Sequence, residues 1–317
     1  AYADVSPNEL FELYSDNSDD SGPTYGYYKL SEQECYHWQD TKEEYQDTPN
    51  SLWGGYYSAI AAANMALNAI EEKGNPASLD PQRGEALVCR AYCHFMLANI
   101  FCNAYDTHAS QSLGVPYMEE VETTVSPRYE RGTLEEVYRK VERDLLEGID
   151  LISDDSYSVP KYHFTRKAAY AFAARFYLYY MKPDFSNCDR VIDFATRVLG
   201  TNPADLLRNW EALGNLSVNG NVQADAYIAS SNEANLLISS TVSNWGAIGS
   251  DYLIGPRYFH NQTLATSETC LSSGLWGSSD YFYLKPFSTN GFVASILRKS
   301  GLYEGTYLSL IHISEPT

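Results

Sequence analysis

The side chains that could act as nucleophiles, proton carriers or metal ligands are scattered along the sequence. No G-x-S-x-G, H-E-x-x-H, phosphate-loop or G-x-G-x-x-G pattern occurs. None of the six histidines has a second histidine at metal-ligand spacing, and His94, among apolar helical neighbours, is expected to be a core histidine. With 41 Asp and Glu residues, a pair of catalytic carboxylates like that of a glycosidase remains an alternative, but the sequence indicates no particular pair. We therefore expect no catalytic residue, no metal site and no cofactor.

Aromatic side chains offer binding chemistry instead, since the chain holds 27 Tyr, 12 Phe and 5 Trp. Their rings present flat apolar faces, and Tyr and Trp add a polar group at the edge, which suits a ligand that is partly apolar and partly hydrated. Trp38, Trp245 and Trp276 lie in polar, loop-like contexts, where they could serve as ligand platforms. Tyr252 and Tyr258 lie in the same loop-rich stretch as the last two Trp and complete the candidate ligand-binding set.

The charge balance excludes some partners. With 22 Lys and Arg against 41 Asp and Glu, the formal net charge is -19, which would repel nucleic acid and anionic lipid. No run of 18 apolar residues occurs, as a membrane-spanning helix would require. The six Cys form no C-x-x-C pair, and we expect most of them to be buried free thiols.

Hydrophobic residues at steps of three and four predict five helices between residues 52 and 200. The predicted segments are Leu52–Glu72, Leu79–Phe101, Arg131–Ile152, Phe164–Lys182 and Asp189–Gly200. Thr133 with Glu136 forms a capping box, and Thr165 is an N-cap. Trp53, Tyr56 and Tyr57 follow the period of the first helix, which favours places in the core over ligand contacts.

The helices are expected to pack in antiparallel pairs. Alanines at close-contact positions, among them Ala62, Ala63 and Ala173, alternate with Tyr and Phe, as in tetratricopeptide-like repeats. Beyond Pro203 no period is sustained. The sequence therefore predicts an all-α fold of tetratricopeptide-like helix pairs with a loop-rich, irregular C-terminal ligand-binding part.

Five segments in order resemble the SusD/RagB family of nutrient-uptake lipoproteins from the outer membrane of Bacteroidetes. They are W..YY..I..AN..L from Trp53 to Leu67, GEALVCRAYCHFML with Arg90, LGVPY from Leu113 to Tyr117, R.T..EVY..V..DL from Arg131 to Leu145, and TRKAAYAFAARFYLY from Thr165 to Tyr179. The resemblance implies a SusD-like scaffold that binds glycans, or peptides in the RagB branch. It also implies a SusC-like TonB-dependent transporter as partner and a surface-exposed, lipid-anchored location on the outer membrane.

The sequence departs from the family at its ends. The family carries its lipid on an N-terminal Cys, whereas Cys35 is internal with no lipobox before it. The tail LSLIHISEPT (Leu308 to Thr317) resembles a translated sequencing adapter. We therefore interpret residues 1–307 as a SusD-like domain truncated at both ends, with a helical core over 52–200, a ligand-binding part over 201–307, and read-through over 308–317. The membrane anchor would belong to the parent protein alone.

Four functions remain to be compared. Surface capture of an oligosaccharide without catalysis is favoured by the family resemblance and by the aromatic content. A peptide-binding RagB-like protein would share the same scaffold. An α-helical glycosidase or lyase would need two carboxylates at a fixed separation and would turn its ligand over. A plain tetratricopeptide scaffold would show a clean repeat through the last third, which this sequence lacks.

Overall fold

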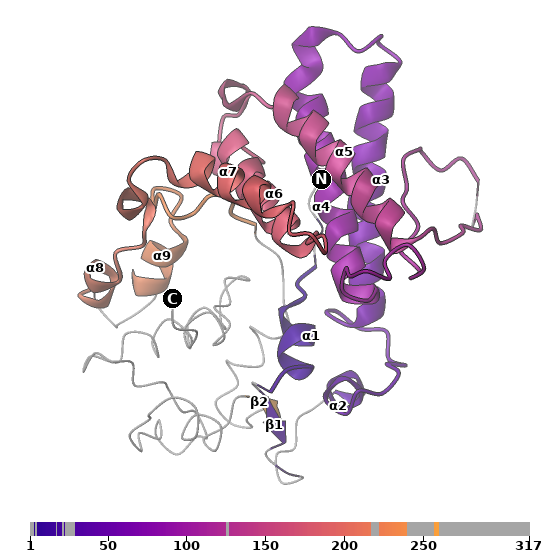
Figure 1. Cartoon of the computed structure of the whole chain (residues 1–317). Coiled ribbons are helices and arrows are strands. Elements are labelled where there is room, and N and C mark those ends of the chain that lie inside the picture. Colours follow the sequence, from indigo (N-terminus) through magenta and orange to yellow (C-terminus); the bar gives the residue numbers. More distant parts are fainter. Residues whose placement is uncertain are drawn as a thin grey trace. The chain divides into compact units, whose positions relative to one another are not determined.

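In the part of the chain that the structure, a computed structural model, describes, nearly all regular secondary structure is helical (Figure 1). The structure describes residues 3, 5–16, 18–20, 22, 29–124, 127–216, 222–239 and 257–259. Within these residues the strands are β1 (Asp19–Asp20) and β2 (Tyr258–Phe259). The all-α prediction is confirmed. No helix in the described ranges is long and apolar enough to cross a membrane.

The chain divides into two units, which we describe separately. The first comprises Trp53–Leu207 together with Ala1–Ala3 and Glu233–Ser239. The second comprises Asp4–Leu52, Arg208–Asn232 and Ser240–Thr317. This partition separates the predicted helical core, which falls in the first unit, from most of the predicted C-terminal part.

Five long helices build the first unit, as the periodicity predicted. They are α3 (Pro49–Glu71, in this unit from Trp53 onward), α4 (Asp80–Phe101), α5 (Leu134–Leu151), α6 (Arg166–Tyr179) and α7 (Cys188–Leu199). Short 3-10 turns lie between these helices at Ala77–Leu79, Asp154–Ser156 and Pro160–Tyr162, and another follows α7 at Pro203–Leu206. The two predicted caps are also present, since Thr133 and Glu136 bond reciprocally and Thr165 Oγ1 accepts from Ala168 N–H.

Helices α3 and α4 run antiparallel. Trp53 at the start of α3 contacts Phe101 at the end of α4, and further along α3 Asn64 contacts Arg90 in the middle of α4. Among the predicted close-contact alanines, Ala63 and Ala173 are buried, but Ala62 is exposed, so its assignment was wrong.

Glycine defines the crossing of α4 and α5. A Cβ on Gly84 would lie 2.7 Å from the Gly148 carbonyl oxygen, and a Cβ on Gly148 would lie 2.7 Å from the Gly84 carbonyl oxygen. Such distances are too short for any side chain, so these two residues permit the backbones to approach. Helices α6 and α7 pack as a second pair, with the rings of Tyr177 and Phe194 stacked at 5.8 Å.

The second unit contributes shorter elements. These are α1 (Asn8–Leu13), α2 (Leu30–Tyr36), α8 (Trp210–Gly214), α9 (Val222–Ile228) and the two strands. The strands pair antiparallel, with Asp20 opposite Tyr258. Arg257, next to β2, donates two hydrogen bonds of 2.7 Å to the carboxylate of Asp20 in β1. This bidentate ion pair stabilises the pairing of the two strands.

Candidate functional site

A stretch without regular secondary structure, Leu113–Val121, lies against the face formed by α3 and α4, and we call it the strap. Buried or half-buried backbone groups need partners. Apart from an isolated β-bridge between Leu113 and Thr133, the carbonyls of the strap obtain theirs from side chains. Its carbonyl oxygens accept six hydrogen bonds from four side chains: Arg131 donates to Leu113 and Gly114, Tyr57 to Pro116, Asn64 to Met118 and Glu120, and Arg90 to Glu119. Side chains from α3, from α4 and from Arg131, which precedes α5, therefore hold the strap in place.

A buried ion pair lies beneath the strap. Arg90 Nε donates to Asp144 at 2.6 Å, and the two side chains are 7% and 1% exposed. Arg90 also donates to Asn64 Oδ1 at 3.0 Å, so the amide that holds the strap is itself oriented. Asp144 accepts further bonds from the Tyr117 hydroxyl at 2.7 Å and from Arg143. Asp144 thus has three hydrogen-bonding partners, which offset the cost of burying its charge.

His94 is the second fixed point under the strap. Its Nε2 accepts from the Met118 N–H at 3.0 Å, so its Nδ1 carries the proton and donates to the Arg90 carbonyl at 2.9 Å. Its ring stacks on Tyr117 with centroids 3.7 Å apart. Burial lowers the pKa of His94 from 6.5 to about 3, which keeps the ring neutral. The prediction of a core histidine is confirmed.

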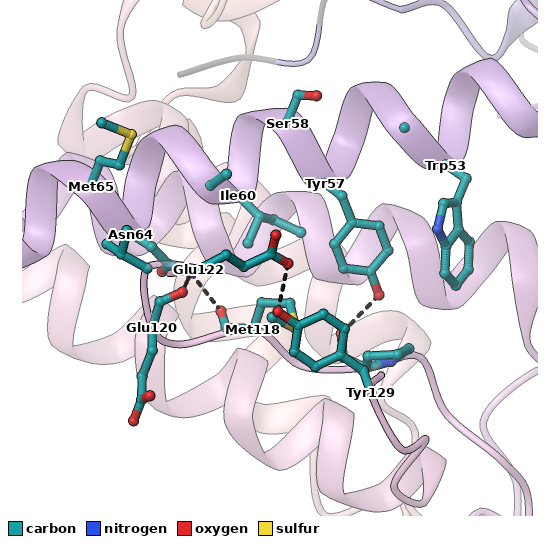
Figure 2. A pocket seen from close by; sticks show the side chains of 14 residues that line it. Trp53, Tyr57, Ser58, Ile60, Asn64, Met65, Met118, Glu120, Glu122 and Tyr129 are labelled. Carbon is teal, nitrogen blue, oxygen red and sulfur yellow. Dashed lines mark hydrogen bonds between the residues drawn. The ribbon is translucent and has the colours of Figure 1, made fainter. Parts of the chain in front are cut away.

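The strap and α3 enclose a pocket of about 450 Å³ (Figure 2). This volume lies within the range of small-molecule sites. Trp53 and Tyr57, one helical turn apart, line it with ring centroids 4.9 Å apart and planes inclined by 50°. Tyr129 faces them from beyond the strap, and its hydroxyl donates to Glu122 at 2.6 Å. The other lining residues are Gly54, Ser58, Ile60, Ala61, Asn64, Met65, Pro116, Met118, Glu120 and Val121.

This arrangement suits binding more than catalysis. Aromatic faces line one wall, and carboxylate, hydroxyl and backbone groups lie at the rim, as a ring with an apolar face and polar edges would require. The buried acid nearby, Asp144, is occupied by Arg90, Arg143 and Tyr117. No group of three or more His, Cys, Asp or Glu able to hold a metal ion is found in the described ranges.

Two of the predicted ligand-binding residues lie in the described part of the second unit. Trp38 follows α2 and is 73% exposed, with its ring 4.7 Å from that of Tyr14 and a backbone φ of 56°, in the left-handed region. Tyr258 is buried, and its ring stacks on Tyr36 at 4.7 Å. Trp245, Trp276 and Tyr252 lie outside the described residues, so their roles stay predictions.

Sequence reasoning missed the pocket aromatics of α3. It placed Trp53, Tyr56 and Tyr57 together in the core, and of these only Tyr56 is buried. Two parallel stripes explain the difference. Positions 52, 56, 59, 60 and 63 face the core, whereas 53, 57, 61 and 65, spaced by four, face the pocket. The four-residue spacing of the second stripe was the signal available in the sequence.

The comparisons identify relatives of the chain. A SusD-like family model, described as "Starch-binding associating with outer membrane", matches residues 1–178. No curated protein sequence matches. The structures of SusD superfamily proteins from Bacteroides thetaiotaomicron and Bacteroides vulgatus are similar, with 21% identity and TM-scores of 0.54 and 0.58, respectively. A structure with a xylogluco-oligosaccharide is 20% identical, with a TM-score of 0.50.

These likenesses cover most of this chain and less of the others. The three matches cover 68%, 84% and 84% of this chain but only 45%, 58% and 47% of the respective matched chains. The chain thus spans about half the length of these solved structures. At this level of identity, the structural matches concern the fold.

Proposed function

Because the chain belongs to the SusD-like family, which is described as starch-binding and associating with the outer membrane, we propose that it binds a soluble oligosaccharide without cleaving it. The observation that carries the proposal is the pocket of α3 and the strap. Trp53 and Tyr57 offer faces to the apolar side of a sugar ring, and the rim offers polar groups to its hydroxyls. The ligand of one similar structure, a xylogluco-oligosaccharide, agrees with this chemistry.

In the whole protein, the same binding would serve nutrient capture at the cell surface. We place that protein on the outer membrane through a lipid anchor, beside a SusC-like TonB-dependent transporter that would receive the glycan. The family description supports the membrane association. The partner and the anchor follow from the family resemblance of the sequence, so they form part of the proposal.

The proposal includes a second set of ligand contacts, which belong to the second unit of the chain. Trp38 offers an exposed indole, and Trp245, Trp276 and Tyr252 complete the set. Tyr258, which sequence reasoning also included, is buried against Tyr36 and is left out of the ligand contacts. Replacing a platform Trp by Ala should weaken binding by about 1–3 kcal/mol, the size of a binding hot spot. The fold should persist because an exposed ring such as that of Trp38 contributes little to the core.

The test is calorimetry with maltohexaose, laminarihexaose and a xyloglucan heptasaccharide. Binding should be weak, in the micromolar to millimolar range or about -4 to -8 kcal/mol, because sugar hydroxyls must lose water before the rings stack. Trp53→Ala should cost about 1–3 kcal/mol of binding free energy. Tyr162→Ala is the matched control, since this aromatic side chain is 49% exposed and does not line the pocket.

Three outcomes would contradict parts of this proposal. Cleavage of a glycan would favour the glycosidase or lyase alternative. Binding of peptides alone would leave the family assignment intact and favour a RagB-like function. Glycan binding that Trp53→Ala leaves unchanged, while Trp38→Ala weakens it, would assign the binding site to the set that includes Trp38 and not to the pocket.

A further inference from the structure

The pocket carries negative charge at its mouth. Glu120 and Glu122 both line it and are exposed, and no Lys, Arg or His is among its lining residues. We propose that the pocket accepts uncharged glycans and rejects glycans that carry carboxylate or sulfate groups, with Glu120 and Glu122 as the specificity-determining residues. This inference rests on the proposed function, and it names the class of glycan that the pocket selects.

Four basic residues lie beside the strap, and each has partners other than the pocket acids. Arg131 donates to the carbonyls of Leu113 and Gly114. Lys140 and Arg143 pair with Glu119, the strap residue beside Glu120, at 2.5 and 2.7 Å. Arg90 and Arg143 also bind the buried Asp144. Lys140, Arg143 and Arg90 therefore balance Glu119 and Asp144, and none of them pairs with Glu120 or Glu122.

Glu122 has a neutral partner. The hydroxyl of Tyr129 donates to its Oε1 at 2.6 Å, which orients the carboxylate without cancelling its charge. Within the described residues, no basic side chain forms an ion pair with Glu120 or Glu122. An incoming anionic sugar would thus meet two carboxylates and no basic side chain among the lining residues.

The negative mouth is a local property. A second pocket of about 570 Å³ in the same unit, between the start of α6 and the end of α7, is lined by Arg166, Lys167 and Arg197 together with one acid, Asp154. The excess of acidic residues in the whole chain therefore does not give every pocket an acidic lining. The difference supports assigning selectivity to the residues of the first pocket.

The experiment compares glycans that differ only in charge. Maltohexaose, cellohexaose and laminarihexaose are titrated into the protein, each beside its counterpart oxidised to the carboxylate at C6. We expect any neutral hexaose that binds to lose at least tenfold in affinity on oxidation at 20 mM salt. The loss should shrink at 500 mM salt, where charges are screened within a few ångströms. It should also shrink in Glu120→Gln/Glu122→Gln, which keeps the size of both side chains.

The matched control is Glu135→Gln/Glu147→Gln, which removes two exposed acids of α5 that do not line the pocket. This variant should keep the full tenfold loss. Oxidised hexaoses should also fail to displace a bound neutral hexaose. This competition reports on the first pocket alone, whether or not an oxidised hexaose binds in the second, basic pocket.

The outcomes separate this inference from the proposed function. Equal affinity for a neutral hexaose and its oxidised form, or a loss that Glu120→Gln/Glu122→Gln leaves unchanged, would overturn the charge selectivity alone. If none of the six glycans binds, the selectivity and the pocket's assignment as a glycan site both fail.

Discussion

At the scale of single residues, the ion pair of Arg90 and Asp144 links the core to the strap. Both side chains are buried, and Arg90 also orients the Asn64 amide that binds two strap carbonyls. Arg90→Met would leave Asp144 and Asn64 with fewer donors in a place that water does not reach. We expect a loss of about 3 kcal/mol in the free energy of unfolding, near the lower end for breaking a buried pair, because Arg143 still binds Asp144.

The control for this prediction lies on the same two helices. Arg83 of α4 pairs with Glu147 of α5, but their side chains are 30% and 42% exposed. Arg83→Met should therefore cost about 0–1 kcal/mol, as exposed pairs do. Urea unfolding followed by circular dichroism would measure both variants. Equal losses would show that burial does not determine the contribution of these pairs.

His94 predicts a pH dependence at the same scale. Its pKa is about 3 in the folded protein and near 6.5 when unfolded, so between these values the unfolded chain binds the extra proton. The stability contributed by the neutral ring is therefore present above pH 6.5 and lost as the pH falls toward 3. The loss should reach about 1.4 kcal/mol per pH unit within this window.

Comparison with His94→Gln isolates this contribution, because glutamine can still accept from the Met118 N–H but does not titrate. Unfolding free energies at pH 4.5, 5.5, 6.5 and 7.5 should fall more steeply for the wild type than for the variant as the pH is lowered. Parallel pH profiles would mean that His94 does not account for the dependence.

At the scale of elements, the glycine contact between α4 and α5 determines how closely the helices pack. Gly84→Ala would place a methyl group 2.7 Å from the Gly148 carbonyl oxygen, so the backbones must separate. We expect a loss of about 1–3 kcal/mol, typical of overpacking. Gly54→Ala is the control, because nothing lies within 4 Å of its Cβ position, and it should stabilise α3 by about 0.5–1 kcal/mol. Thermal unfolding of both variants would test the opposite signs.

The elements also show what the sequence could predict. All five helices of the first unit are signalled locally, by periodicity and by caps such as Thr133, and those signals depend on neighbouring residues. The strap has no such signal, because its carbonyls are bound by side chains such as Tyr57, 59 residues away from Pro116. The pocket was missed for the same reason, since one wall is the strap. Trp53 looked like a core residue until that wall was known.

At the scale of the whole molecule, the net charge of -19 should influence stability. The compact protein holds its acids closer together than the unfolded chain does, and like charges repel. Salt weakens this repulsion, since the Debye length falls from about 30 Å at 0.01 M to about 10 Å at 0.1 M. We therefore expect sodium chloride to raise the midpoint of thermal unfolding at pH 7.5 by a few degrees, where about 1 kcal/mol corresponds to ~2–4 °C for domains of 150–250 residues.

The same titration near pH 4.6, the isoelectric point, is the control, because the net charge is close to zero there and the salt effect should vanish. Scanning calorimetry between 10 and 200 mM sodium chloride at both pH values would measure it. A midpoint that falls with salt at pH 7.5 would mean that screening of exposed pairs, such as Arg197 with Asp193, outweighs relief of the general repulsion. In that case the charge pattern, and not the charge total, would determine how this acidic protein responds to its medium.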